Sequence, residues 1–115
     1  MPFLILCTNI AKSKISPNFV QNTTKLLASV LNKPETSIWI HVQPDQFLNY
    51  AGTDEPCAYC QLKTIARINA ETNQKFAPPI TEHLMNELGI PGNRICIKFV
   101  DIDPTTVSYS GKLMR

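Results

Sequence analysis

The sequence has no long apolar run and no concentration of charge of either sign. Lys and Arg number 11 and Asp and Glu 9, so the net charge is +2, and no basic block or basic–aromatic stripe occurs. Proteins that bind nucleic acid usually carry such a concentration of positive charge, so nucleic acid is not an expected partner. A membrane span needs about 20 consecutive, mostly apolar residues. No stretch of the sequence approaches that length, and we expect no membrane insertion.

An export signal of the usual kind is also lacking. The residues from Met1 to Cys7 are mostly apolar, but no basic residue precedes them, and Thr8-Asn9 interrupts the run too early for a signal peptide. We expect a protein that is cytoplasmic, secreted without a signal peptide, or both. The 4 cysteines of such a chain do not indicate a disulfide framework, so we expect reduced thiols.

Length and composition suit one small domain. The chain has 115 residues, of which 43% are hydrophobic, and we place a single domain over residues 1–115. A domain of this size buries only a moderate core, and oligomerisation is a common way to bury more apolar surface.

Four short segments rich in strand-forming residues alternate with two helical patterns. The predicted strands are residues 3–7, 38–42, 58–65 and 95–100. The first helix is predicted to have Ser16 as its N-cap and Pro17 at its first helical position, and to end at residues 32–34. Its apolar face is predicted to consist of Phe19, Thr23, Leu26, Leu27, Val30 and Leu31.

The second helical pattern contains an internal conflict. Apolar residues recur at four-residue intervals, at Phe76, Ile80, Leu84 and Leu88. The Gly-Ile-Pro sequence at 89–91 is a typical helix ending. However, Pro78 and Pro79 lie inside the pattern, where a proline costs about 3 kcal/mol. We predict that this helix begins near Pro79 or kinks there.

The order of these elements predicts an α+β fold. In each half of the chain two strands flank one helix at the spacing of a βαβ unit, whose strands are parallel and whose crossover is right-handed. Two such units side by side give a four-stranded mixed sheet with both helices on one face. The other face has no helix to cover it, so Trp39 and its neighbours would be exposed in a single chain. We therefore predict association through the sheets.

Several short stretches resemble one known family. They are Met1-Pro2, Thr8-Asn9, Asn32-Lys33-Pro34, His41-Val42, Pro44-Asp45-Gln46, Glu55-Pro56-Cys57-Ala58-Tyr59-Cys60 and Asn93-Arg94. Together with the chain length and the βαβ repeat, they make the sequence similar to the macrophage migration inhibitory factor family of the tautomerase superfamily, which includes D-dopachrome tautomerase. The similarity runs without an evident gap from Met1 to about Val107.

The resemblance implies a homotrimer and an isomerase that interconverts keto and enol forms of phenylpyruvate-type or dopachrome-type substrates. It implies that removal of Met1 frees the amine of Pro2, which acts as the general base. Lys33 is the implied cationic partner, and the Ile65 backbone N–H is the implied hydrogen-bond donor. The far wall of the pocket, partly from a neighbouring subunit, falls on Cys96, Lys98, Val107, Tyr109 and Met114. The implied substrate is a small aromatic keto acid, and no metal or organic cofactor is required.

The chemistry of these residue types fits that role. A general base works best with a pKa near the working pH, and an ordinary α-amine titrates near ~8. Desolvation and the charge of Lys33 would both lower the pKa of a nearby amine. Lys33 and the Ile65 N–H can also bind the substrate oxygen on which negative charge develops. Judged by position alone, however, Lys33 is a solvated charge at a helix C-terminus and Ile65 is a core residue.

Two positions depart from the family pattern. Family members usually carry tyrosine where this chain has Cys96, and asparagine where it has Lys98. A second cation favours an acidic substrate or disfavours an aromatic one, so we expect a weak or shifted activity. The alternative is a secreted, cytokine-like ligand with a vestigial pocket and a cell-surface receptor, and retention of Met1 would favour it.

The cysteines and histidines offer an alternative chemistry. Cys57 and Cys60 have the spacing of a thiol–disulfide exchange pair, but they enter a strand rather than a helix, and we favour buried cysteines that act as small apolar residues. No second pair of residues has the spacing of a zinc site. We expect His41 to be an isolated strand residue and His83 to lie on a helix surface.

Overall fold

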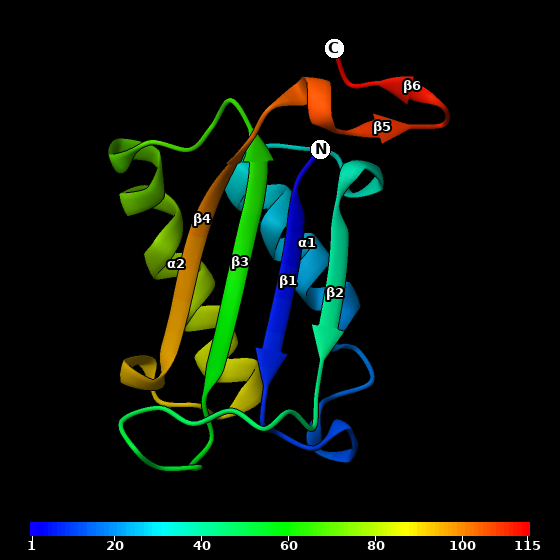
Figure 1. Ribbon diagram of the computed structural model, residues 1–115. Coiled ribbons are helices and arrows are strands. Elements are labelled where there is room, and N and C mark those ends of the chain that lie inside the picture. Colours follow the sequence, from blue (N-terminus) through cyan, green and yellow to red (C-terminus); the bar gives the residue numbers. More distant parts are fainter.

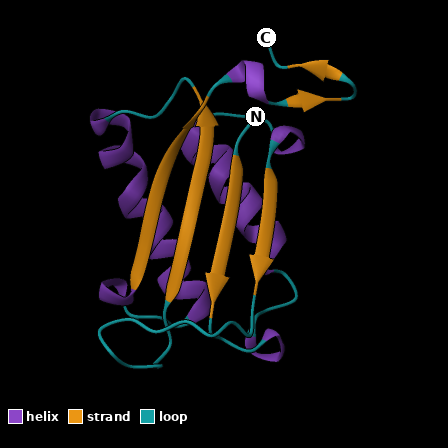
Figure 2. Cartoon of the chain, viewed as in Figure 1, coloured by secondary structure: helices purple, strands orange, loops and turns teal.

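A four-stranded sheet with two helices packed on one face forms the body of the molecule (Figure 1, Figure 2). The computed structural model describes residues 1–115. Its elements in chain order are β1 (Phe3–Thr8), α1 (Phe19–Leu31), β2 (Trp39–Gln43), β3 (Ala58–Ile65), α2 (Ala70–Leu88), β4 (Ile95–Ile102), β5 (Ser108–Tyr109) and β6 (Lys112–Leu113). One-turn 3-10 helices lie in the connections, at η1 (Lys12–Lys14), η2 (Glu35–Ser37), η3 (Gly92–Arg94) and η4 (Pro104–Thr106). No helix has both the length and the apolar character needed to cross a membrane.

The sheet has the strand order β2-β1-β3-β4. β1 is parallel to β2, β3 is parallel to β4, and the two pairs meet along the antiparallel neighbours β1 and β3. Each βαβ unit therefore supplies one half of the sheet. The predicted mixed sheet with both helices on one face is confirmed, and the strand bounds differ from the predicted ones by at most two residues.

Alternation along the strands divides the sheet into a buried and an open face. On the buried face, Leu4 pairs with Leu62 and Leu6 pairs with Cys60, and all four are at most 1% exposed. The helices cover this face with Phe19, Leu27 and Leu31 of α1 and with Phe76, Ile80 and Leu84 of α2. Two apolar helix faces and one apolar sheet face thus form a single core.

The other face of the sheet carries no helix. Three rows of side chains cross it: Trp39–Phe3–Lys63–Val100, His41–Ile5–Gln61–Lys98 and Gln43–Cys7–Tyr59–Cys96. None of these twelve residues, which we call the open face, is buried. Trp39 is 52% exposed, and its ring stacks on that of Phe3 with the centroids 6.1 Å apart. The sheet therefore offers a partly apolar surface to a partner, as the sequence predicts.

α1 begins later than predicted. Its first residue is Phe19, with Asn18 as N-cap, rather than Pro17 with Ser16 as N-cap. Ser16 still organises the entry to the helix. Its hydroxyl accepts a hydrogen bond from the Asn18 N–H at 3.2 Å, and its carbonyl accepts one from the Phe19 N–H at 3.0 Å. These bonds close a tight turn ahead of the first α-helical turn.

α2 begins at Ala70, so the predicted start near Pro79 is wrong. Asn69 and Thr72 form a capping box, in which the Asn69 side chain accepts from the Thr72 N–H at 2.9 Å and the Thr72 hydroxyl accepts from the Asn69 N–H at 3.3 Å. This reciprocal pair satisfies two of the N–H groups that a helix start leaves without partners.

The two internal prolines do not end α2. Pro78 and Pro79 lack the N–H groups that would bond to the carbonyls of Gln74 and Lys75. Gln74 and Lys75 are exposed, so water can satisfy both carbonyls. The opposite side of the helix keeps its apolar face on the sheet across the prolines, and this burial outweighs the lost backbone bonds.

His83 is half-buried between the two helices. The expectation that it lies on the exposed surface of a helix is therefore wrong. Its Nε2 is 3.0 Å from the Thr23 hydroxyl, and its ring stacks on that of Phe19. The Asn22 side chain donates a hydrogen bond to Glu87 at 2.9 Å beside this contact. Polar contacts therefore join α1 to α2 at the edge of the core.

The His83 contact predicts how stability depends on pH. Burial lowers the pKa of His83, and the Glu87 carboxylate partly opposes this. Below about pH 6.5 the unfolded chain therefore binds more protons at this site than the folded chain. We predict that this stabilising contribution is complete above about pH 6.5 and decreases as the pH falls, and that His83→Gln removes this part of the dependence. Denaturant unfolding of both proteins across this range measures it, and identical pH profiles would contradict it.

Candidate functional site

The chain begins in the interior of the sheet. β1 is a central strand between β2 and β3, and Pro2, which precedes it, is less than 2% exposed. The Pro2 carbonyl accepts a hydrogen bond from the Trp39 N–H at 3.0 Å. While Met1 is present, the Pro2 nitrogen is a tertiary amide and the free amine belongs to Met1. The terminal amine is thus carried by a backbone that is fixed from the second residue onward.

Lys33 is placed by the way in which α1 ends. Asn32 adopts a left-handed conformation with φ of 52°, which asparagine tolerates better than most residues. The Lys33 N–H then bonds back to the Ala28 carbonyl at 3.0 Å and the Asn32 N–H to the Ser29 carbonyl at 3.4 Å, which is a Schellman ending. Pro34 follows and cannot continue the helix. The Asn-Lys-Pro sequence therefore fixes the backbone from which the Lys33 side chain extends.

The N-terminal amine and Lys33 share one electrostatic environment. Burial lowers the pKa of the N-terminal amine below its ordinary value, and the positive charge of Lys33 lowers it further. Both causes act against the charged form of an amine. A terminal amine at this position is therefore more often neutral, and hence available as a base, than one at an exposed terminus.

The Ile65 backbone lies opposite the chain start. Phe3 pairs with Lys63, and the Trp39–Pro2 bond directs the backbone groups of even-numbered β1 residues toward β2. By alternation, the Phe3 and Lys63 backbone groups face each other, and those of Ile65 point toward the position of Met1. No backbone hydrogen bond outside the regular elements uses the Ile65 N–H. This donor is available beside the terminal amine.

Cys96 and Lys98 do not reach Pro2 within one chain. Cys96 pairs with Tyr59 near the end of the sheet far from Ile65, and Lys98 pairs with Gln61 in the middle of β3. Tyr59 and Gln61 are six and four residue steps from Ile65, which corresponds to about 20 and about 13 Å of strand. Both side chains are exposed and lie on the open face.

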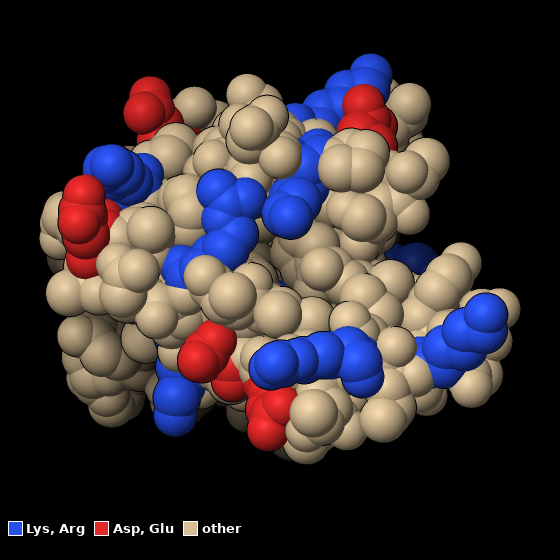
Figure 3. All heavy atoms as spheres, turned by 90° about the horizontal axis from the view of Figure 1, so that it is seen from above, with Lys and Arg blue, Asp and Glu red and all other residues tan.

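The C-terminal segment leaves the sheet at the end where β1 begins. Val107 and Met114 are half-buried and joined by a hydrogen bond from the Met114 N–H to the Val107 carbonyl at 2.9 Å, whereas Tyr109 is 56% exposed. The β5–β6 hairpin turns at residues 110–111, both with positive φ, and its main contacts are within itself and with η4. Figure 3 looks onto this end, where basic side chains surround a recess beside the projecting segment.

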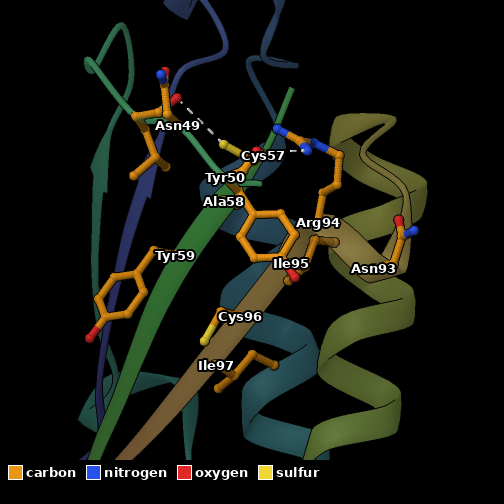
Figure 4. Close-up of a pocket in the computed structure, with 11 residues that line it drawn as sticks. Asn49, Tyr50, Cys57, Ala58, Tyr59, Asn93, Arg94, Ile95, Cys96 and Ile97 are labelled. Atoms are coloured by element: carbon orange, nitrogen blue, oxygen red, sulfur yellow. Dashed lines mark hydrogen bonds between the residues drawn. The ribbon is translucent and has the colours of Figure 1, made fainter. Parts of the chain in front are cut away.

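A cavity of about 490 Å³ lies at the opposite end of the sheet (Figure 4). Its lining comes from the loop after β2 and from the starts of β3 and β4, at Leu48, Asn49, Tyr50, Cys57, Ala58, Tyr59, Asn93, Arg94, Ile95, Cys96 and Ile97. In the close-up the Tyr50 ring lies between Arg94 and Cys96. The terminal amine is not part of this cavity, which is mostly apolar and is lined in part by Cys96.

Arg94 and Asn9 shape this cavity by holding the loop between β2 and β3. The Arg94 guanidinium donates to the carbonyls of Pro56, Tyr50, Glu55 and Thr53 at 3.0 to 3.4 Å. It also lies over the Tyr50 ring, 5.4 Å from its centroid. The Asn9 side chain donates to the carbonyls of Leu48, Asp54 and Glu55 and accepts from the Cys57 N–H. Asn9 and Arg94 both lie in the stretches that resemble the known family, but the sequence does not reveal that they hold the same loop.

Cys57 and Cys60 are buried, as favoured from the sequence, and neither forms a disulfide. Burial raises the pKa of the Cys60 thiol to about 12. The Cys57 thiol lies 3.6 Å from the Leu48 carbonyl oxygen. Thiol–disulfide exchange requires an accessible thiolate, which this arrangement disfavours. No group of three or more His, Cys, Asp or Glu side chains is arranged to hold a metal ion.

Comparisons with known proteins assign the family. The sequence profile described as Macrophage migration inhibitory factor (MIF) matches residues 1–115. Macrophage migration inhibitory factor homologues from Trichuris trichiura and Brugia malayi are 37% and 36% identical to the chain, over 96% of it and over 97% and 96% of their own lengths. The structure of the factor from Trichinella spiralis matches with a TM-score of 0.93 at 31% identity, covering 96% of this chain and 98% of that one. The chain belongs to the macrophage migration inhibitory factor family.

Burial of the two cysteines predicts their reactivity. Because a thiol with a pKa of about 12 is almost entirely protonated near neutral pH, Cys60 in the folded protein should resist an alkylating reagent, and buried Cys57 should resist it as well. Both should react once denaturant unfolds the chain. Peptide mass spectrometry after alkylation with and without denaturant measures this. Rapid labelling of either residue in the native protein would contradict the prediction and favour a redox role.

Proposed function

We propose that the chain, after removal of Met1, is a keto–enol tautomerase of the isomerase class that uses the Pro2 amine as its general base. The observation that carries the proposal is the position of Pro2, which is buried and bonded to β2 directly behind a terminal amine of Met1 whose pKa is lowered by burial and by Lys33. A base must be neutral to accept a proton, so such a position makes a proline amine effective near neutral pH. Membership of the macrophage migration inhibitory factor family supports the same class of activity.

The proposed reaction moves one proton between carbon and oxygen. The neutral Pro2 amine removes a proton from the carbon next to the keto group of an aryl pyruvate-type substrate, and becomes an ammonium. The electron pair of the broken C–H bond forms the C=C bond, and the keto oxygen takes negative charge. Lys33 and the Ile65 N–H donate hydrogen bonds to the substrate oxygens. The Pro2 ammonium then gives its proton to that oxygen and returns to its neutral form, so the enol is formed, no electrons leave the substrate and no cofactor is required.

The remaining pocket wall is proposed to come from a neighbouring copy. Cys96 and Lys98 are too far from Pro2 in their own chain but are exposed on the open face, from which they can enter a neighbour's site. Val107, Tyr109 and Met114 of the C-terminal segment complete the proposed substrate contacts. A lysine in place of an amide makes this wall more basic, which favours substrates with acidic groups, and a cysteine in place of a tyrosine removes an aromatic hydroxyl.

A homotrimer is the proposed assembly. The open face and the projecting β5–β6 hairpin both expose apolar side chains, with Trp39 at 52%, Tyr109 at 56% and Leu113 at 58%. Exposed apolar surface of this kind usually marks an interface. A small chain also gains stability when association buries such a surface.

The assembly is tested by light scattering on the purified chain. We predict a mass about three times the 12.9 kDa of one chain, independent of dilution through the micromolar range. Truncation before Ser108 removes the hairpin and should shift the population toward smaller species. A full-length chain that stays monomeric would contradict the proposed site, because the wall residues would have no amine to face.

Signalling is a second proposed role, and the names of the relatives support it. The relatives from Xenopus tropicalis and Mus musculus are called macrophage migration inhibitory factor, at 33% and 32% identity. A receptor would bind the outside of the assembly, and this role does not need a free Pro2 amine. The intact mass of the natural protein separates the two, since retained Met1 excludes Pro2 as the base and leaves only the ligand role.

Loss of the proline amine is the direct test of the enzyme. With hydroxyphenylpyruvate as substrate, a form that retains Met1, in which the Pro2 nitrogen is an amide, should have a kcat/KM about 10²- to 10⁴-fold lower, the usual contribution of a general base. Pro2→Gly, which exchanges the fixed secondary amine for a primary amine on a more mobile residue, should lower it less. Lys33→Ala should mainly raise KM. Pro17→Gly, in the exposed turn before α1, is the matched control and should keep wild-type rates. Equal rates for the processed protein and the form that retains Met1 would end the proposal.

A further inference from the structure

The Thr64 hydroxyl is a buried polar group without a partner. Thr64 is 3% exposed, and its Oγ1 makes no hydrogen bond. A buried hydroxyl that gives up water without gaining a partner lowers stability. The other buried threonines differ, because Thr8 bonds to the Cys57 carbonyl at 2.8 Å and Thr23 to His83 at 3.0 Å. The unpartnered hydroxyl of Thr64 therefore requires an explanation.

The strand register places Thr64 opposite Pro2. On the buried face Leu4 pairs with Leu62, and the same register, extended by one step beyond the Phe3–Lys63 pair, sets Pro2 across from Thr64. Both are buried, in keeping with the alternation along each strand. The Pro2 carbonyl faces β2, so Pro2 and Thr64 form a pair without mutual backbone hydrogen bonds. In antiparallel sheets the Cα atoms of such pairs are only about 4.5 Å apart, which brings their side chains close together.

The missing partner has a simple chemical cause. With Met1 attached, the Pro2 nitrogen is a tertiary amide that has no N–H and no basic lone pair. Removal of Met1 turns it into a secondary amine with one N–H and one lone pair, or with two N–H groups when protonated. Processing therefore creates a hydrogen-bond donor on the residue opposite the unpartnered hydroxyl.

We infer that Thr64 positions the catalytic base, because its Oγ1 accepts a hydrogen bond from the N–H of the free Pro2 amine. This inference rests on the proposed function of Pro2. An N–H held toward the buried face leaves the lone pair of the neutral amine directed away from the core, toward Lys33 and the substrate. Thr64 does not touch the substrate and acts only through Pro2.

The same bond adjusts the basicity of Pro2. A hydrogen bond to the protonated amine is charge-assisted and stronger than one to the neutral amine, so the hydroxyl raises the pKa of Pro2. Burial and Lys33 act in the opposite direction on an amine at the chain start. The hydroxyl thus keeps the amine basic enough to accept a proton from carbon.

Two substitutions of Thr64 separate positioning from packing. Thr64→Val keeps the shape and removes the hydroxyl, whereas Thr64→Ser keeps the hydroxyl and removes a methyl group. We expect Thr64→Val to lower kcat about tenfold with little change in KM, because one hydrogen bond is lost. The acidic limb of the kcat/KM pH profile should move to lower pH by up to about one unit, because the pKa of Pro2 falls. Thr64→Ser should keep the wild-type profile. A purely structural role predicts the reverse order, because serine leaves a cavity and valine does not.

A second measurement does not depend on catalysis. Thermal unfolding is compared for wild type and Thr64→Val, each with Met1 removed and each in a form that retains a residue ahead of Pro2. Thr64→Val should raise Tm in the extended form, where it removes an unpartnered hydroxyl, and lower Tm in the processed form, where it removes a bond. The same change in both forms overturns the inference. Wild-type protein whose activity does not depend on Pro2 overturns the proposed function instead. The comparison of Tm values still tests the hydrogen bond between Pro2 and Thr64 in that case.

Discussion

The structure depends on the insertion of the first residues of the chain between two strands. Pro2 is buried and bonded through its carbonyl to Trp39, and β1 continues from it as a central strand. A chain start is normally the most mobile part of a small protein. Here Pro2 is held at the start of a strand that is paired on both sides, so removal of Met1 would expose an amine on a fixed residue. An amine fixed in a partly desolvated and positively charged position has the properties of a base, whereas a mobile, hydrated terminus does not.

Residues in the stretches that resemble the family have structural roles in addition to the chemical roles proposed for the site. Asn32 takes the left-handed conformation that ends α1 ahead of Lys33. Asn9 and Arg94 bind the carbonyl groups of the loop between β2 and β3, and thereby shape the cavity that Cys96 lines. Ending the helix and binding the loop carbonyls both fix the position of the backbone. Short motifs that lie far apart in the sequence therefore contribute to one arrangement of the backbone. The Cys96 and Lys98 substitutions leave this framework in place and alter only exposed side chains on the open face.

Periodicity predicts the sheet, and β3 begins and ends where the sequence indicates. The start of α2 is missed because Pro78 and Pro79 dominate the local pattern, although Asn69 and Thr72 carry the spacing of a capping box. The β5–β6 hairpin is also missed, since two-residue strands have no periodicity, and only the Ser110-Gly111 turn marks it. The charge of Lys33 is close enough to the terminal amine of Met1 to lower its pKa, whereas the pairing of Pro2 with Lys33 that the resemblance implies stays a prediction. Register alone shows that Thr64 faces Pro2 and that Cys96 does not, because both facts depend on strand pairing, which a single sequence does not display.

The central claim is that the Pro2 amine is a neutral base because of where the chain begins. Nitrogen-15 NMR of the chain labelled at proline, with Met1 removed, follows the titration of this one atom directly. We expect a pKa below the ~8 of an ordinary α-amine, and a rise toward that value in Lys33→Met, which keeps the length of the side chain without its charge. A pKa at or above the ordinary value, unchanged by Lys33→Met, would contradict it.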